Sequence, residues 1–481
     1  MKTNSSRFYI TTTLPYVNAK PHLGFAMEII RADIIARYHG ALGEEVFFNT
    51  GTDEHGQKIY DKAIELGQTP QAYVDELAEK FRDLITPLGI SSDIHFIRTT
   101  DQNHIEAAQE FWRQCDHNGF IYKKNYQTKY CVGCELEKTD SELVDGKCPL
   151  HSNLILEIRD EENYFFKFSA FGDKLLAFYE ARPDFIFPAE RVNEMKALIE
   201  RGLQDFSISR LATKMSWGIP VPGDETQVMY VWFDALVNYV SAVGWPDDQD
   251  SFKKWWLDNG GVVQYCGKDN LRQQTAMWQA MLMAADIPNS KCVIVEGFVT
   301  SGGQKMSKSA GNVVDPLAVV EKYGTDALRY FVAGELAMFE DSDFTWERFH
   351  DAYNSKLANG LGNLVSRVMK MSESYLPEPV TVGEVALPDE FKKWLDVFDI
   401  GRATDLIWQK ITELDLKIQA TQPFKLIKEA RPAAEKIVAE LVQGVAEIAE
   451  MLSFIMPATA EKIKVLIKEN KMPEPLFLRK N

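Results

Sequence analysis

The chain of 481 residues has no long apolar run and no excess of positive charge. Without a stretch of about 18 consecutive apolar residues, we expect no membrane-spanning helix. Its 53 lysines and arginines are outnumbered by 70 aspartates and glutamates, so the formal net charge is −17. Such a charge argues against indiscriminate binding of nucleic acid, but it still permits a local basic patch.

Cysteine is also scarce, with six in the chain, and Cys115, Cys266 and Cys292 stand alone. A secreted disulfide framework is therefore not expected, and a reducing cytoplasm is favoured. The N-terminal stretch MKTNSSRFYITTTLPYVN is interrupted by threonines and ends in Pro15 and Asn18, so we expect no secretory signal. Internal repeats and low-complexity segments are absent as well.

What the chain does contain is an alternation of strand and helix patterns. Residues 8–13 and 45–49 are typical of strands, and residues 22–42 place apolar side chains on one helical face. After residue 260, VVQYCG and KCVIVEG are typical of buried strands. This order predicts an α/β Rossmann-like fold with a doubly wound parallel sheet.

The rest of the chain departs from this alternation in two places. Between the two sets of strands, the sequence is β-rich and carries cysteines, which indicates an insertion. Beyond residue 355, long amphipathic helical patterns predict an all-α region. We therefore predict four segments: a first catalytic half at 1–117, an insertion at 118–209, a second half at 210–354 and a helical domain at 355–481.

KPHLGFAME places His22 and Gly24 where the first strand leads into the first helix. The unpaired N–H groups and the dipole of a helix start favour anions, and the His22 side chain can donate to a phosphate. Gly24 leaves room for a flat ligand. Taken alone, the same residues are explained equally by a histidine near a helix cap with no ligand.

GGQKMSKSAGN, residues 302–312, carries two lysines between glycines. Lys305 and Lys308 supply point charges for phosphate oxygens, and Gly302 and Gly303 allow the backbone to move. A solvated basic loop is the commoner fate of two such lysines. The pairing of this loop with HLGF is what favours a phosphate site.

Four residues in the insertion have the spacing of a metal site: Cys131-x2-Cys134, then Cys148-x2-His151. Three thiols and an imidazole suit tetrahedral zinc, and a closed set of four ligands is structural rather than catalytic. We therefore predict one structural Zn²⁺ per chain.

HLGF and KMSKS together resemble the His-Ile-Gly-His and Lys-Met-Ser-Lys-Ser signatures of class I aminoacyl-tRNA synthetases. The resemblance is closest to the methionyl-tRNA synthetase family and covers nearly the whole chain. TLPYVN, TGTDEHG, the single knuckle, YVWFDALVNY, GKD, KMSKS and NLVSR occur in that family's order. It implies that methionine is activated with ATP and joined to initiator and elongator tRNA(Met), releasing AMP and pyrophosphate.

The resemblance also implies roles for particular residues. It places His22, Lys305 and Lys308 in catalysis, and these three bind ATP together with Gly24 and Asp269, with Mg²⁺ accompanying the nucleotide. Asp53 would pair with the α-ammonium group, and Trp232 would close over the amino acid. The implied methionine-binding set is Leu14, Tyr16, Asp53, Trp232, Tyr239 and Gln274. For Trp232 and Tyr239, core packing is an alternative explanation.

Three positions depart from the family's pattern. Phe25 replaces the second histidine of the first signature, Asn270 stands where an apolar residue is frequent, and Gln274 replaces a histidine. Phe25 puts one ATP contact in question. Asn270 and Gln274 put in question the shape of the amino-acid pocket.

The helical C-terminal region resembles the family's anticodon-binding domain. Asn363 and Arg367 match positions that contact the anticodon, and Phe424 stands where the family carries tryptophan. Either ring can stack on an unpaired base, although Phe424 also suits a core position. Residues 461–481 carry six Lys or Arg against three Glu, a basic end on an acidic chain.

Two other functions compete with this interpretation. One is cysteinyl-tRNA synthetase, which resembles the chain less because that family has a cysteine near the first strand. The other is a non-catalytic tRNA-binding protein on a synthetase scaffold, which the intact KMSKS, Asp53 and Asp269 disfavour. The resemblance further suggests a cytoplasmic monomer, because the appended dimerising domain of some members has no counterpart here.

Overall fold

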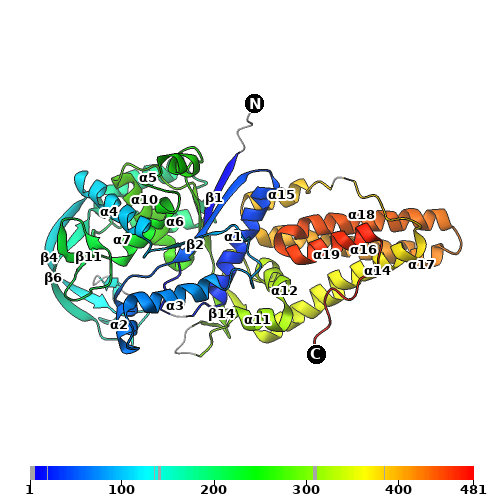
Figure 1. The fold of residues 1–481 in the computed structure, drawn as a ribbon, viewed down its shortest axis with the longest axis horizontal. Coiled ribbons are helices and arrows are strands. Elements are labelled where there is room, and N and C mark those ends of the chain that lie inside the picture. Colours follow the sequence, from blue (N-terminus) through cyan, green and yellow to red (C-terminus); the bar gives the residue numbers. More distant parts are fainter. Residues whose placement is uncertain (1–5, 19, 135, 139–141, 307–310, 384) are drawn as a thin grey trace.

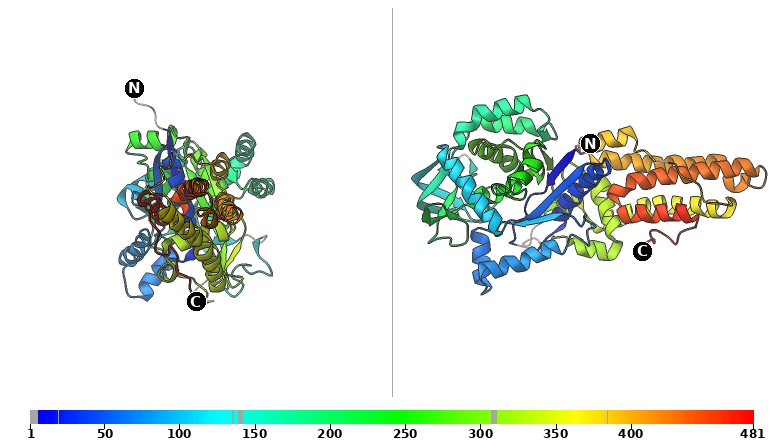
Figure 2. Two further views of the ribbon diagram at one scale, coloured as in Figure 1. Left: turned by 90° about the vertical axis from the view of Figure 1, so that its right-hand side faces the viewer. Right: turned by 45° about the horizontal axis from the view of Figure 1, so that its top comes forward.

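The computed structural model describes residues 6–18, 20–134, 136–138, 142–306, 311–383 and 385–481. An α/β part holds the N-terminal two thirds, and a long helical region projects from one side of it (Figures 1 and 2). In the described part of the chain, no helix combines the length and the apolar character needed to cross a membrane.

A six-stranded sheet organises the α/β part. All its neighbouring strands are parallel, in the order β3-β2-β1-β12-β13-β7. Order reverses between β1 and β12, which is the crevice where doubly wound sheets bind ligands. The strands are β1 (Arg7–Thr11), β2 (Glu45–Thr52), β3 (His95–Arg98), β7 (Ile186–Phe187), β12 (Val263–Gly267) and β13 (Cys292–Glu296).

Helices cover both faces of this sheet, and the longest of those near it is α1 (Leu23–Ala41). Most of its apolar side chains are buried, and so are Arg31 and Asp33, each of which meets a charged partner on another element. The other helices near the sheet are α2 (Gln57–Glu65), α3 (Pro70–Arg82), α4 (Gln102–His117), α10 (Trp278–Ala284), α11 (Pro316–Tyr323) and α12 (Thr325–Tyr330).

The segment between β3 and β12 builds two smaller antiparallel sheets. The first has the order β5-β4-β6-β8, with β4 (Ile121–Cys131), β5 (Leu136–Lys138), β6 (Glu157–Phe166) and β8 (Phe206–Ser207). The second has the order β10-β11-β9, with β9 (Ser209–Leu211), β10 (Pro220–Val221) and β11 (Asp224–Met229). Its helices are α5 (Gly172–Ala181), α6 (Arg191–Glu200), α7 (Val231–Leu236), α8 (Asn238–Ser241) and α9 (Gln249–Phe252).

The lysine loop, residues 302–312, begins at a third small sheet, whose strands have the order β15-β14-β16. Its strands are β14 (Val299–Ser301), β15 (Gln304–Lys305) and β16 (Ser342–Phe344). The C-terminal region is helical, with α13 (Trp346–Ala352), the π-helix η7 (Tyr353–Gly362), α14 (Asn363–Tyr375), α15 (Asp389–Asp396), α16 (Ile400–Thr421), α17 (Pro423–Leu426), α18 (Arg431–Ile455) and α19 (Pro457–Glu469).

A continuous hydrophobic core joins the helical region to the sheet through α1. The fully buried Arg329 strengthens this junction, because its guanidinium donates to the carbonyls of Phe454 and Ile455 at the end of α18 and lies 2.7 Å from Asp33 of α1. The helical region is therefore held in a fixed place beside the sheet.

The predicted doubly wound parallel sheet and the helical C-terminal region are confirmed. The second strand is longer than expected and runs on to Thr52, so it includes the first three residues of TGTDEHG, which was expected to be a loop. β7 lies inside the expected insertion yet extends the main sheet beside β13. The four segment boundaries stay predictions.

Candidate active site

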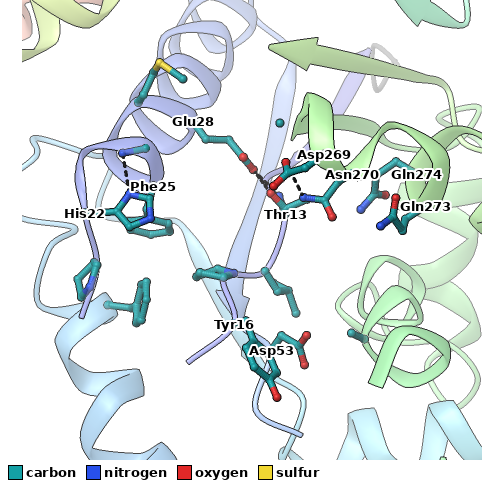
Figure 3. A pocket seen from close by; sticks show the side chains of 18 of the residues that line it. Thr13, Tyr16, His22, Phe25, Glu28, Asp53, Asp269, Asn270, Gln273 and Gln274 are labelled. Atoms are coloured by element: carbon teal, nitrogen blue, oxygen red, sulfur yellow. Dashed lines mark hydrogen bonds between the residues drawn. The ribbon is translucent and has the colours of Figure 1, made fainter. Parts of the chain in front are cut away.

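A cavity of about 660 Å³ opens at the carboxyl ends of the central strands. The predicted ATP- and methionine-binding residues whose side chains the structure describes all line it, and they come from motifs as far apart as the segment after β1 and the helix after β12. The lining includes Leu14, Tyr16, His22, Gly24, Asp53, Trp232, Tyr239, Asp269 and Gln274. Figure 3 labels Tyr16, His22, Asp53, Asp269 and Gln274 among them.

His22 is the N-cap of α1, with an extended backbone and an exposed side chain. Its Nδ1 accepts a hydrogen bond from the Gly24 N–H at 3.0 Å, which fixes the proton of the neutral ring on Nε2. A Cβ on residue 24 would lie 2.8 Å from the His22 Cε1, so glycine is required for this ring position. The neutral imidazole therefore presents its Nε2–H as a donor at the N-terminus of α1.

Phe25 also lines the cavity, and its ring packs edge-on against Phe81 of α3 with centroids 5.1 Å apart. Figure 3 shows it beside His22. Its ring has no hydrogen-bond donor, so at this position the wall of the cavity is apolar.

Asp53 follows β2 and is held by backbone hydrogen bonds to the TLPYVN segment. Its N–H donates to the Pro15 carbonyl at 3.0 Å, and its carbonyl accepts from the Val17 N–H at 3.1 Å. Gly56 has φ +117°, and a Cβ there would lie 2.6 Å from the Tyr16 hydroxyl. Tyr16 and Asp53 therefore form one rigid wall of the cavity.

A buried chain of hydrogen bonds forms another wall. Gln264 Nε2 donates to Gln274 Oε1 at 2.6 Å, and Gln274 Nε2 donates to the Tyr239 hydroxyl at 2.7 Å. Gln274 lies in the π-helix η5 (Gln273–Met277), and burial raises the pKa of Tyr239 well above its ordinary value. The wall thus carries neutral groups in fixed orientations.

Two carboxyl groups in the cavity were missed by sequence reasoning. Glu28 Oε1 accepts from both the N–H and the hydroxyl of Thr13 at 2.5 Å, and Glu296 lies 3.1 Å from Arg31. Burial raises the pKa of Glu28, and it raises that of Glu296 to about 7. Figure 3 shows Glu28 hydrogen-bonded to Thr13, and Asp269 hydrogen-bonded to Asn270. Both glutamates stood in quoted motifs, but nothing in those motifs indicated that they would meet.

The base of the lysine loop is fixed by Asp343. Its carboxylate accepts from the Thr300 hydroxyl at 2.7 Å and from the Gly303 N–H at 2.8 Å. Gly302 and Gly303 have φ of +62° and +73°, which non-glycine residues rarely adopt. Lys305 ends β15, and Lys308 lies outside the described residues.

The predicted zinc ligands come together at the end of the β4–β6 hairpin. One ligand atom from each of the four residues lies within 4.8 Å of the others. Hydrogen bonding from His151 and Cys134 outweighs the effect of burial and lowers the pKa of the Cys148 thiol to about 6. A Cβ on Gly133 would lie 2.4 Å from the His151 ring, so the turn needs glycine. Three soft thiols and an imidazole at this spacing fit Zn²⁺.

The three predicted anticodon residues lie in the helical region, away from the cavity. Asn363 is exposed at the start of α14, and Arg367, one turn later, forms a 2.7 Å ion pair with Asp415 of α16. Phe424 is 44% exposed in α17, so it is not a core residue of this structure. Figure 1 shows α17 at the end of the helical region farthest from the sheet.

Comparison with known proteins agrees with this geometry. The family model described as tRNA synthetases class I (M) matches residues 8–155 and 152–369. The methionine–tRNA ligase of Thermosynechococcus vestitus is 46% identical over 392 residues, or 80% of this chain and 73% of that protein. That of Thermotoga maritima is 39% identical over 475 residues, or 95% of this chain and 74% of that protein.

A solved structure of Mycobacterium tuberculosis methionyl-tRNA synthetase in complex with methionyl-adenylate superimposes with a TM-score of 0.91. It is 34% identical, and the match covers 99% of this chain and all of that one. The apo form of the same enzyme gives a TM-score of 0.84 at 32% identity. The chain belongs to the class I tRNA synthetases, within the methionine–tRNA ligase family.

Proposed function

We propose that this chain activates L-methionine with ATP and transfers it to the 3′ end of tRNA(Met). The observation that carries the proposal is that one cavity gathers the residues of five separate motifs at the topological switch of the sheet. Its relatives are named methionine–tRNA ligases, and one is described with methionyl-adenylate bound.

The rigid position of the Asp53 carboxylate supports the assignment of one half of the cavity to methionine. Asp53, 8% exposed and fixed through its backbone, is placed to pair with the substrate's α-ammonium group. The side chain of methionine then lies among Leu14, Tyr16, Tyr239 and Gln274, and Trp232 closes over it. The fixed amide and hydroxyl of Gln274 and Tyr239 offer the thioether oriented polar contacts.

The start of α1 and the Asp269 side chain support the assignment of the other half of the cavity to ATP. The His22 Nε2–H and the helix dipole meet the phosphates, and Gly24 keeps the backbone close to them. Asp269 accepts hydrogen bonds from the vicinal hydroxyls of the ribose. Lys305 and Lys308 neutralise the departing pyrophosphate, and Mg²⁺ accompanies ATP because it pairs with the negative phosphate oxygens.

The chemistry needs little covalent help from the protein. An oxygen of the methionine carboxylate attacks the α-phosphorus in line, and the bond to the bridging oxygen of pyrophosphate breaks. A hydroxyl of the terminal tRNA ribose then attacks the carbonyl carbon of the adenylate, and AMP leaves. Both steps are accelerated by positioning and by neutralising charge that develops in the transition state.

The remaining assignments concern the metal, the tRNA and the state of the protein. Cys131, Cys134, Cys148 and His151 hold one structural Zn²⁺ that ties the insertion together. Asn363, Arg367 and Phe424 contact the anticodon, a role supported by their exposed or half-exposed side chains. We assign a monomer in the cytoplasm, the latter supported by six cysteines without a disulfide.

Methionine-dependent exchange of pyrophosphate into ATP tests the proposal directly. The wild-type chain should catalyse exchange with methionine and not with cysteine, and it should charge tRNA(Met). Lys308→Ala should slow the burst of adenylate formation by about 100-fold or more, because its charge acts mainly in the transition state. Binding of tRNA without any exchange would instead favour a non-catalytic tRNA-binding protein.

A further inference from the structure

Two buried side chains next to the cavity have no role in the function proposed so far. His55 follows Asp53 by two residues, and Asp234 follows Trp232 by two residues. His55 Nδ1 lies 3.1 Å from Asp234 Oδ2, and their side chains are 5% and 0% exposed. The contact therefore joins the loop that carries Asp53 to the helix that carries Trp232.

The loop side of this contact is rigid. Glu54 is fully buried, accepts two hydrogen bonds from Arg98 at 2.7 and 2.8 Å, and accepts another from the Thr100 hydroxyl at 2.6 Å. The Glu54 carbonyl accepts from the Trp217 indole at 2.6 Å. His55 is thus presented from a backbone that is fixed on both sides.

The helix side is short. α7 has six residues and is separated from α8 by Val237 alone, so few backbone hydrogen bonds within α7 itself fix its orientation. Asp234 lies in its first turn, where the helix dipole favours a carboxylate. Burial raises the pKa of Asp234, an effect that the neighbouring His55 opposes. The second carboxylate oxygen, Oδ1, has no hydrogen-bond partner among the described residues.

The surroundings offer no replacement for His55. His104 of α4 also interacts with the pair, but its Nδ1 lies 2.9 Å from the Ser241 hydroxyl, and burial lowers its pKa to about 3. It is therefore neutral at physiological pH. Because a buried carboxylate without its partner is costly, loss of His55 would force α7 to shift or Asp234 to take up a proton.

We propose that His55 and Asp234 are positioning residues for methionine: their contact holds α7, and with it Trp232, in register with Asp53. This rests on the proposed function of the cavity and adds to it the link between its two methionine-binding walls. The nucleotide half, built on α1 and η4 (Lys268–Asn270), lies on other elements and does not depend on the pair.

The test is a double-mutant cycle in the pyrophosphate-exchange assay, with His55→Gln, Asp234→Asn and the double variant. We expect KM for methionine to rise about 10- to 100-fold in each single variant, because small displacements of positioning groups have effects of this size. KM for ATP should change by no more than about twofold. The double variant should be no worse than the poorer single one, since either change breaks the same contact.

His39→Gln is the matched control. His39 forms a histidine–carboxylate contact of the same kind with Glu44, 2.5 Å apart, where α1 leads into β2 at the opposite ends of the strands. It should leave both KM values unchanged. Calorimetric titration of methionine should give the same loss of affinity as the KM values, independent of turnover.

Two results would overturn the proposal that the His55–Asp234 contact positions Trp232. One is an equal rise in KM for methionine and KM for ATP, and the other is additive effects of the two substitutions on KM for methionine in the double variant. If His55→Gln does not fold in a thermal unfolding scan, Asp234→Asn decides alone, because it keeps the shape of the side chain. Failure of the wild-type chain to exchange with methionine would refute the proposed function instead, so the two failures are distinguishable.

Discussion

The cavity, proposed to bind ATP and methionine, and the outer part of the helical region, proposed to bind the anticodon, differ in how their polar side chains are held. Along one wall of the cavity, the polar side chains are buried and hydrogen-bonded to one another, in the chain from Gln264 through Gln274 to Tyr239. In the helical region, Arg367 is 37% exposed with its charge held by Asp415, and the ring of Phe424 is 44% exposed. We infer that the cavity is organised before a small substrate binds. The exposed side chains of the helical region are instead open to RNA bases that become unstacked on binding.

This difference has an energetic reason. A small ligand offers few contacts, so the protein must hold each group in place in advance. An RNA loop offers many contacts and unstacked bases, and it can adapt to exposed side chains. Substitutions in the cavity should therefore affect the first chemical step, whereas substitutions in the helical region should affect only the tRNA-dependent one.

The largest effect should come from Asp53→Ala. Removing the carboxylate takes away the partner of the substrate's ammonium group in a buried setting, and kcat/KM for methionine should fall by about 100-fold or more. Exchange and charging should fall together, as measured in both assays with the same preparation. A loss of charging with normal exchange would contradict the role assigned to Asp53.

Cys148→Ser should have the next largest effect, through metal and local folding. The chain should lose its one zinc, measured by elemental analysis, because the hydroxyl is a poor substitute for the thiolate. Charging of tRNA should fall about tenfold or more as the hairpin loosens. Cys115→Ser, which changes a lone buried thiol, should retain the zinc. A wild-type chain without zinc would refute the metal site.

Arg367→Ala should separate the two regions most clearly. KM for tRNA should rise about tenfold and the preference for the CAU anticodon should weaken, because a charged donor to a base edge is lost. Exchange without tRNA should be unchanged. Asp415→Asn is the control: it removes the ion-pair partner but leaves the guanidinium, so KM for tRNA should not rise. If exchange fell with charging, Arg367 would be a structural residue.

Phe424→Ala should have a smaller effect of the same kind. Loss of one stacking face costs about 1–3 kcal/mol per base in favourable cases, and an edge position in α17 should give the lower end of that range. Phe424→Trp should restore or improve charging, because the indole offers a larger face. Unchanged KM for tRNA in both variants would show that this ring does not stack on a base.

The smallest effect concerns pH and lies inside the cavity. Because burial raises the pKa of Glu296 to about 7, the folded chain holds a proton there that the unfolded chain has already lost. The free energy of unfolding should therefore fall as pH rises from about 4.5 to 7, by an amount on the order of 1–3 kcal/mol. In Glu296→Gln this decline should be smaller, measured by denaturant unfolding across that range. An identical pH profile would mean that Glu296 is ionised throughout.

The sequence by itself predicted the alternation of strands and helices, the cluster of Cys131, Cys134, Cys148 and His151, and most of the residues that line the cavity. These features follow from local patterns: apolar periodicity, the Cys-x2-Cys and Cys-x2-His spacings, and motifs that must follow strands of a parallel sheet. His22 and Gly24 were predictable because a helix start and its cap are set by neighbouring residues, and the structure shows them capping α1.

Only the tertiary structure decided which distant groups meet. Arg31 and Glu296 are 265 residues apart, and His55 and Asp234 are 179 apart, yet each pair is in contact and buried. Their spacing in the sequence carries no signal, since contact depends on how the sheet, the insertion and the helical region pack. The same holds for β7, whose two residues join the main sheet because β13 offers it an edge. Burial then fixes the protonation of Glu28 and Glu296, which composition and motifs leave open, because the cost of a charge depends on the surrounding solvent.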